Sequence, residues 1–305
     1  MRNFFARLFR GCRTIKARPD WIEFVGNDWP DTIMTVIPTD DFHEKQGRST
    51  CRWIIKKNGQ QLSVYLKRHY QLPWWQGLFS LLFPWAHWAP GLQEWRHLNW
   101  AEAQGIPVPT PVAGAEYAGP GWKLQSMLAI KELADMLPLH QAIPYAQDVL
   151  APSDFLTWKK ALVVEMARLS RKLHTRNHFH KDLYLCHFYL PRAVIYGWAG
   201  QYQRESLQGD LHLIDFHRLG HHPVTRTWWQ IKDLAQLLYS TDVEGVTTRD
   251  CIRFWRLYRQ GSRRGLRTKF FEWCIRVKWW RYKDHNEKRL RRIERQSSSK
   301  KEAAA

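Results

Sequence analysis

Three short segments of the chain carry side chains whose types and order suit phosphate chemistry. In chain order they are Val64-Tyr65-Leu66-Lys67, His180-Lys181-Asp182-Leu183-Tyr184-Leu185-Cys186-His187-Phe188 and Leu213-Ile214-Asp215-Phe216-His217-Arg218. A strand lysine such as Lys67 neutralises nucleotide phosphates, and a carboxylate such as Asp182 orients and deprotonates an acceptor hydroxyl. A second carboxylate, here Asp215, holds Mg²⁺ across the β- and γ-phosphates. The three segments together predict transfer of a phosphoryl group from ATP, with Mg²⁺ as the metal ion.

Taken singly, these residues have simpler interpretations. Lys67 is then a solvated strand lysine, and Asp215 ends a turn. Three histidines and Cys186 within thirteen residues also suggest zinc, but their spacing fits no familiar zinc site. The prediction of phosphoryl transfer therefore depends on the joint pattern of the three segments.

The second and third segments resemble the motifs of a known family. Residues 180–188 are close to its H-R-D-x-Y-x-C-H-F motif, and residues 214–218 are close to its I-D-x-H-R motif. The chain thus resembles the lipopolysaccharide kinases, the Kdo and core-heptose kinases, over about residues 45–260. This resemblance implies a protein-kinase-like fold and a heptose or Kdo hydroxyl of the lipopolysaccharide core glycolipid as acceptor.

The resemblance also implies roles for the charged residues. It makes Asp182 the catalytic base, Asp215 the Mg²⁺ ligand and Lys67 the phosphate-binding lysine. Glu94 becomes the ion-pair partner of Lys67 on the helix of the first lobe. Glu102, eight residues further on, is the competing candidate for that pair.

Further ATP contacts follow from the same resemblance. The backbone of Glu132 and Leu133 is expected to meet the adenine. The G-x-G-x-x-G loop of protein kinases is absent. Arg48, Ser49 and Thr50 are expected to cover the phosphates in its place.

The remaining site residues support the loop that carries the predicted base. The resemblance implies that Asp233 braces this loop through backbone N–H groups and that His180 is a packed support. His187 stands where a protein kinase has Asn, and Mg²⁺ prefers oxygen ligands, so His187 is either a metal ligand or a hydrogen-bonding positioner. Lys181 replaces the usual Arg and lacks its bidentate geometry, so activation by a phosphorylated loop is not expected.

The elements that must position these residues can be read from local patterns. Residues 51–57 and 62–68 flank Asn58-Gly59, which predicts a β-hairpin. Residues 92–104 predict a helix with Glu94 on its first turn, and Ser153 or Asp154 is expected to cap a long helix that ends near residue 174. Strands dominate the first part and helices the second, so the expected fold class is α+β.

Four regions are predicted, with a mostly β N-lobe and an α-helical C-lobe at the centre. They are a basic N-terminal segment 1–20, an N-lobe 21–133 with a Trp-rich insertion 71–91, a C-lobe 134–285 and a flexible basic tail 286–305. The prolines Pro73, Pro84 and Pro90 interrupt the insertion, so it cannot form one helix.

Composition limits the class of partner. The chain has 305 residues, 44% of them hydrophobic, which excludes intrinsic disorder. Its 47 Lys and Arg against 28 Asp and Glu leave a net charge of +19, which attracts polyanions. The five cysteines form no C-x-x-C pair, which indicates a reducing compartment. No apolar run is long enough to span a membrane, so we expect a cytoplasmic protein, peripheral on the anionic inner membrane.

Several alternatives stay open at this stage. The Trp-rich insertion is either packed under the first lobe or an interfacial patch that meets lipid. The basic C-terminal region is either a solvated face or a binding site for anionic groups. A kinase-shaped module without catalysis, binding anionic membrane or nucleic acid, is the alternative function, although no specific nucleic acid is expected for the kinase. A kinase for an aminoglycoside-like or protein hydroxyl is a third possibility.

Overall fold

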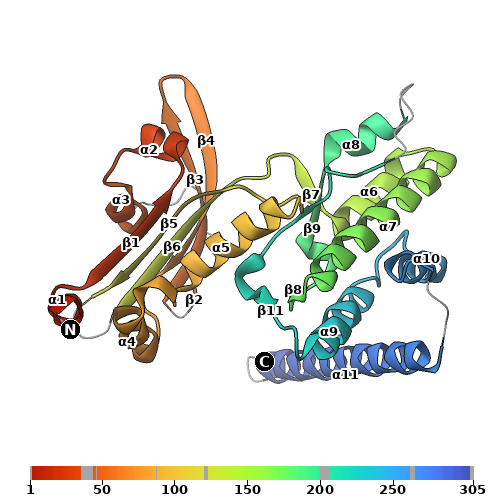
Figure 1. Cartoon of the computed structure of the whole chain (residues 1–305). Coiled ribbons are helices and arrows are strands. Elements are labelled where there is room, and N and C mark those ends of the chain that lie inside the picture. Colours follow the sequence, from red (N-terminus) through yellow and green to blue (C-terminus); the bar gives the residue numbers. More distant parts are fainter. Residues whose placement is uncertain are drawn as a thin grey trace. The chain divides into compact units, whose positions relative to one another are not determined.

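The computed structural model describes residues 2–35, 44–45, 47–86, 88–119, 123–199, 206–261 and 265–302. The chain divides into two compact units, Met1–Ala134 with Leu213–His217, and Asp135–His212 with Arg218–Ala305. The first unit contains the large sheet and the second is mostly helical (Figure 1). The expected α+β class is therefore confirmed.

The strands of the first unit form one antiparallel sheet. Within the described part of the chain its order is β1-β5-β6-β4-β3-β2. The strands are β1 (Cys12–Ala17), β2 (Glu44–Lys45), β3 (Arg48–Lys57), β4 (Gln60–His69), β5 (Pro111–Ala118) and β6 (Leu124–Lys131). Because β1 pairs with β5, residues 12–17 of the expected basic segment 1–20 belong to this sheet, so the segment is not separate from the first unit.

The predicted hairpin is present and longer than expected. Strands β3 and β4 pair from Lys57↔Gln60 outward. Asn58 and Gly59 between them have φ of 51° and 76°, which are the positive values that a two-residue hairpin turn requires. On β4, Val64 and Leu66 point into the core, so Lys67 points to the opposite face of the sheet.

The helices of the first unit pack on this sheet. They are α1 (Arg2–Arg10), α2 (Pro19–Val25), α3 (Trp29–Thr35), α4 (Trp74–Leu82), the short 3₁₀ turn η1 (Pro84–Ala86) and α5 (Pro90–Ala103). Pro73 precedes α4 and Pro90 begins α5, so the prolines break the Trp-rich stretch as predicted. Because α5 begins at Pro90, two residues before the predicted start, Glu94 lies on its second turn rather than on its first.

The second unit is built on helices with short strands and turns between them. In chain order its elements are β7 (Met136–Pro138), α6 (Leu139–Val149), α7 (Pro152–Thr175), β8 (His178–Phe179), η3 (Leu185–His187), β9 (Phe188–Pro191), α8 (Arg192–Tyr196), η4 (Gly197–Ala199), β11 (Gly220–His221), α9 (Arg226–Tyr239), α10 (Thr248–Tyr258) and α11 (Leu266–Glu302). The short elements β10 (His212–Leu213) and η5 (Phe216–Arg218) lie where the chain passes between the units.

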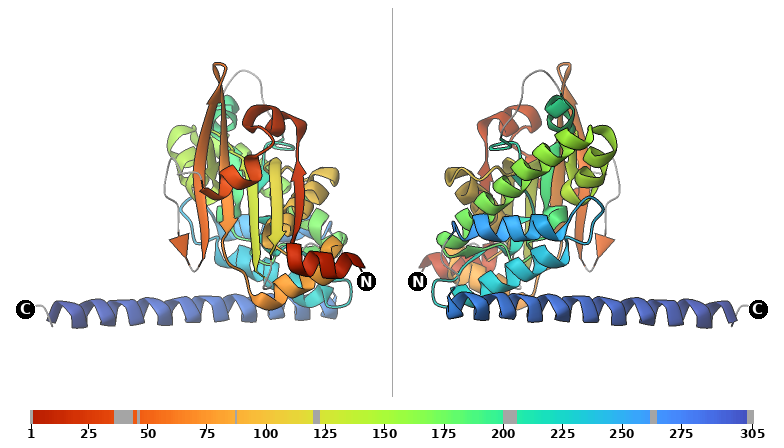
Figure 2. Two further views of the ribbon diagram at one scale, coloured as in Figure 1. Left: turned by 90° about the vertical axis from the view of Figure 1, so that its left-hand side faces the viewer. Right: turned by 90° about the vertical axis from the view of Figure 1, so that its right-hand side faces the viewer.

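Two local predictions for this unit are wrong. The long helix α7 starts at Pro152 after Ala151, not at a Ser153 or Asp154 cap. Proline suits the first helical position because its missing N–H would have had no helical partner there. The basic region from 286 onward is helical as far as Glu302, since α11 is one continuous helix (Figure 2).

Within the ranges that the structure describes, every helix is too short or too polar to cross a bilayer.

A buried carboxyl lies where α5 meets the sheet. Glu116 on β5 is buried and accepts a hydrogen bond of 3.4 Å from the backbone N–H of Ala89, just before α5. Burial outweighs this hydrogen bond and raises the pKa of Glu116 from its usual 4.5 to about 7. Between these two values the folded chain keeps a proton that the unfolded chain has released, so stability falls as the pH rises.

We expect Glu116→Gln to remove this pH dependence, because the amide keeps the acceptor oxygen and cannot ionise. The variant should match the wild type near pH 4 and be more stable above pH 7, by ~3 kcal/mol at most. Urea unfolding across this pH range measures the effect. The control is Glu102→Gln, which makes the same substitution at a half-exposed carboxyl of the first unit. Parallel curves of stability against pH for the wild type and Glu116→Gln would contradict the raised pKa of Glu116.

Candidate active site

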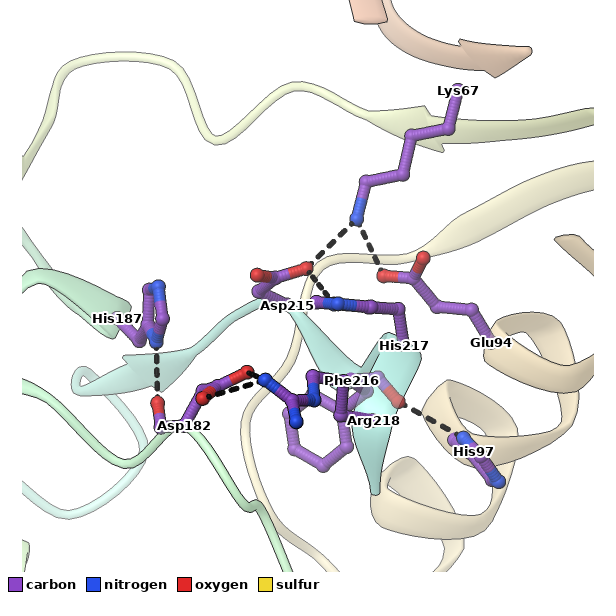
Figure 3. A network of polar contacts seen from close by, with 9 residues as sticks. All are labelled: Lys67, Glu94, His97, Asp182, His187, Asp215, Phe216, His217 and Arg218. Atoms are coloured by element: carbon purple, nitrogen blue, oxygen red, sulfur yellow. Dashed lines mark hydrogen bonds and ion pairs between the residues drawn. The ribbon is translucent and has the colours of Figure 1, made fainter. Parts of the chain in front are cut away.

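The amine of Lys67 lies between two carboxylates of the first unit. Its Nζ is 2.7 Å from Glu94 Oε1 and 3.2 Å from Asp215 Oδ1 (Figure 3). Burial disfavours the charged amine, but Glu94 and Asp215 outweigh this and raise the pKa of Lys67. Glu102, the competing candidate, pairs with Arg18 at 2.9 Å instead. The expected Lys67–Glu94 pair is thus present.

A second contact of α5 holds the segment that carries Asp215. His97 lies three residues after Glu94 on this helix, and its Nδ1 donates to the carbonyl of Phe216 at 2.9 Å. Asp215 itself has a φ of 64°, a left-handed conformation that a non-glycine residue adopts only when its surroundings impose it. His217 Nδ1 is 2.6 Å from Asp215 Oδ1. His97 and His217 were not among the predicted site residues, although the helical spacing of Glu94 and His97 was visible in the sequence.

Positive charge gathers around Lys67 on the same face of the sheet. In the register of the hairpin Thr50 lies opposite Lys67, and Arg48 lies opposite His69. Burial and the charges of Arg48, Lys67 and His217 lower the pKa of His69 to about 4, so its imidazole is neutral at pH 7. Lys67 and Arg48 therefore supply positive charge on this face, and such charge suits a polyphosphate.

Ser49 has a different environment from its two neighbours. Its hydroxyl accepts a hydrogen bond of 2.9 Å from Arg68 Nε and lies 3.2 Å from the hydroxyl of Tyr70. Arg68 is buried and also donates to the carbonyl of Ile33. Ser49 therefore helps to satisfy a buried guanidinium within the sheet.

Glu132 and Leu133 directly follow β6, next to the boundary of the first unit. The backbone N–H of Glu132 donates to the carbonyl of Ser63 at 2.9 Å, and its carboxylate pairs with Arg52 at 2.9 Å. These contacts extend the sheet pairing past the end of β6 and hold the backbone at the predicted adenine-binding position.

In the second unit the carboxylate of Asp182 is held by two side chains. Arg218 Nη1 donates to both of its oxygens, at 3.2 and 2.9 Å (Figure 3). Gln236 Nε2 donates to Oδ1 at 3.3 Å. His187 Nδ1 donates to the backbone carbonyl of Asp182 at 2.6 Å. Sequence reasoning assigned no role to Arg218 or Gln236, although Arg218 ends the third motif.

The backbone around Asp182 is braced from α9. Asp233 is fully buried, and its carboxylate accepts the backbone N–H groups of His180 and Lys181, both at 2.8 Å. His174 Nε2 is 3.2 Å from the same carboxylate. Lys232 Nζ donates to the carbonyl of Lys181 at 2.6 Å, and Lys181 has a φ of 67°. The expected bracing by Asp233 is therefore present, and it holds a residue in a strained conformation.

Asp215 and His187 are the two predicted metal ligands of the site, and their donor atoms decide which metal ion each would suit. Within the described ranges, no three or more His, Cys, Asp and Glu side chains are grouped as a metal site. The carboxylate of Asp215 is a hard oxygen donor of the kind that Mg²⁺ prefers. His187 donates from Nδ1 to the Asp182 carbonyl, a contact that is compatible with either of its two expected roles, because metal-binding histidines also use their second ring nitrogen in this way.

The second unit also contains a cavity of about 660 Å³. It lies among α7, α9, α10 and α11, and its walls include apolar side chains such as Leu162, Met166, Leu237, Phe254 and Ile275. A buried ion pair of 2.9 Å between Lys159 and Asp250 lies at one wall. None of the predicted site residues lines this cavity.

The fold has a relative among solved structures. A protein described as "WaaP in complex with acyl carrier protein" superposes with a TM-score of 0.61 at 24% identity, over 87% of this chain and 98% of that one. The chain therefore has the kinase-like fold of that protein.

Sequence comparisons agree with the fold. The model of the lipopolysaccharide kinase (Kdo/WaaP) family matches residues 38–258. The lipopolysaccharide core heptose(I) kinase WaaP of Pseudomonas aeruginosa is 29% identical over 220 residues, 71% of this chain and 75% of that protein. The protein of the same description from Escherichia coli K12 is 29% identical over 124 residues, 41% of this chain and 44% of that protein.

Since the family model covers well over half of the chain, the protein belongs to the lipopolysaccharide kinase (Kdo/WaaP) family. It is accordingly a phosphotransferase that acts on a sugar hydroxyl of the lipopolysaccharide core. The family resemblance inferred from residues 180–188 and 214–218 is confirmed.

The contacts of Arg218 predict a positioning role. We expect Arg218→Ala to lower kcat by about 100-fold, because a misplaced carboxylate orients the acceptor poorly, with little change in the KM for nucleotide. The matched control is Arg192→Ala, since Arg192 is 46% and Arg218 50% exposed and each pairs with an aspartate of the second unit. Equal kcat values for the two variants in a coupled kinase assay would rule out this role.

Proposed function

We propose that the protein transfers the γ-phosphoryl group of ATP to a heptose hydroxyl of the lipopolysaccharide inner core. The observation that carries this proposal is the buried amine of Lys67 between Glu94 and Asp215. Heptose is preferred over Kdo because relatives that the chain matches over 220, 124 and 166 residues are described as core heptose(I) kinases.

In this proposal Lys67 contacts the phosphates of ATP and Glu94 holds its amine in position. Arg48 and Thr50 lie in register with His69 and Lys67 and add phosphate contacts from β3. The adenine hydrogen-bonds to the backbone at Glu132 and Leu133, where the carbonyl of Glu132 is favoured because its N–H donates to Ser63.

Asp215 would hold Mg²⁺, since it supplies the hard carboxylate oxygen that this ion prefers. When bound, the ion neutralises charge on the β- and γ-phosphates. His97 and Glu94 act indirectly, because the contacts of α5 hold the Asp215 segment and the Lys67 amine.

Asp182 would accept the proton of the acceptor hydroxyl. The acceptor oxygen forms its bond to the γ-phosphorus as the bond to the β,γ-bridging oxygen breaks, and ADP leaves. Arg218 and Gln236 keep the Asp182 carboxylate oriented, and Asp233 and His180 support the backbone that presents it. Arg218 lies three residues after Asp215 in the chain, so one motif supplies both the proposed metal ligand and the partner of the base.

The acceptor is a lipid-anchored glycan, so we place the protein on the cytoplasmic surface of the inner membrane as a peripheral protein. Its net charge of +19 favours an anionic surface and a phosphorylated glycolipid. Family membership favours this function over a binding module without catalysis.

We expect Asp182→Asn to lower turnover of core glycolipid by a factor of 10²–10⁴, because the amide cannot take up the proton. Asp148→Asn, at an exposed aspartate of α6, is the control. Mass spectrometry of the product should show one added phosphate on heptose. A phosphate found on Kdo would show that the acceptor is Kdo and not heptose. Full turnover by Asp182→Asn would overturn the assignment of Asp182 as the base.

The structure relative suggests a second partner. Because that relative is described in complex with acyl carrier protein, we propose that this chain also binds an acylated carrier protein, with the acyl chain in the apolar cavity of the second unit. Met166→Trp would fill the cavity that Met166 lines. We expect this variant to lose pull-down of the acylated carrier protein, while its pull-down of the apo carrier protein stays at the wild-type level. Equal capture of the acylated and apo forms by the wild type would argue against an acyl-binding site.

A further inference from the structure

Helix α4 of the Trp-rich insertion is packed on one side only. Gly77, Ser80 and Leu81 are buried, and Leu81 belongs to a core cluster with Ala118 and Leu124 at the end of the sheet. Large aromatic side chains are exposed along α4 and η1 and at the residue between them, namely Trp74, Trp75, Phe79, Phe83 and Trp85.

Four of these five side chains contact one another outside the core, and Trp74 is exposed beside them at the start of α4. Phe79 is stacked on Trp88 and on Phe83, with ring centroids 4.9 and 6.3 Å apart. Trp75 meets Phe79 and Trp85 meets Phe83 edge to face. No Asp, Glu, Lys or Arg occurs from residue 71 to 91. The result is a continuous uncharged aromatic surface, of a kind that soluble monomers rarely leave without a binding role.

The N-terminal helix α1 lies against α4 and adds exposed phenylalanines and an exposed arginine to this aromatic surface. Arg7 Nε donates to the carbonyl of Leu81 at 3.0 Å, and Leu8 packs against the cluster that contains Leu81. Helices α1 and α4 therefore lie side by side, as Figures 1 and 2 show. Phe5 and Phe9, one helical turn apart, are exposed, and Arg10 is exposed next to them.

We propose that α1, α4 and η1 form a docking surface for an anionic phospholipid bilayer. Tryptophan is favoured at the boundary between headgroups and acyl chains, because its ring is apolar and its N–H is polar. Arginine beside exposed phenylalanine is the pattern of helices that lie in this boundary. Arg10 and the exposed Lys123, which precedes β6 at the same end of the sheet, supply charge complementary to anionic headgroups.

This inference rests on the proposed function for its purpose, since a surface that holds the first unit on the bilayer brings the site to a lipid-anchored acceptor. Its test does not need catalysis. Binding of the full chain to vesicles with phosphatidylglycerol and to vesicles of phosphatidylcholine alone is measured by co-sedimentation, without ATP or acceptor.

The decisive variant is Trp74→Ser with Trp85→Ser, whose side chains are 62% and 69% exposed. We expect it to weaken binding to the anionic vesicles by about tenfold or more. The control is Trp228→Ser with Tyr196→Ser, two aromatics of the second unit that are 58% and 57% exposed, and we expect it to bind within about twofold of the wild type. Arg10→Ser should weaken binding to anionic vesicles only.

A measurement on the wild type makes the result independent of variant folding. Hydrogen exchange should slow in α1 and α4 when anionic vesicles are added, and in no other part of the first unit. Equal binding of both double variants, or no slowing in α1 and α4, would overturn the proposal.

Kinase assays separate this proposal from the proposed function. The Trp74→Ser, Trp85→Ser variant should phosphorylate a soluble, deacylated core oligosaccharide at the wild-type rate and lose turnover only on acceptor in vesicles. If neither acceptor is phosphorylated by the wild type, the proposed function fails while vesicle binding still decides the docking surface.

Discussion

The first unit depends on a charged amine that is placed in a buried position. Taking Lys67 out of water disfavours its charge, so the amine requires opposite charges close by. Glu94 and Asp215 supply them from α5 and from the 213–217 segment, which are far apart in the chain. One ion therefore joins a strand, a helix and a motif segment, and the same positive charge is available to a phosphate.

The second unit depends on a buried acidic side chain that is likewise satisfied by groups from distant parts of the chain. The carboxylate of Asp233 is fully buried, and backbone N–H groups of residues 180 and 181 satisfy it. Hydrogen bonds to the charged form compensate for the loss of water. Because these N–H groups directly precede Asp182, the buried charge of α9 determines the backbone conformation that presents the proposed base.

Much of the fold could be predicted from short-range rules. Asn58-Gly59 predicted the hairpin because these residues tolerate positive φ, and the prolines predicted the breaks around α4. The start of α7 was missed because a proline at the first helical position replaced a side-chain cap. The helical C-terminal region was missed because its dense positive charge resembled a solvated tail, although Lys and Arg are themselves good helix formers.

The sequence by itself determined which residues are the candidates for the chemistry, since the motifs at 180–188 and 214–218 combine specific residue types at fixed spacing. It also determined the kinds of element that carry them. Only the tertiary structure decided the partners: Glu94 rather than Glu102 for Lys67, Arg218 and Gln236 for Asp182, and the exposed side of α4. Spacing along the chain governs local backbone conformation, whereas an ion pair or an exposed face depends on segments that are distant in sequence and meet only when the core packs.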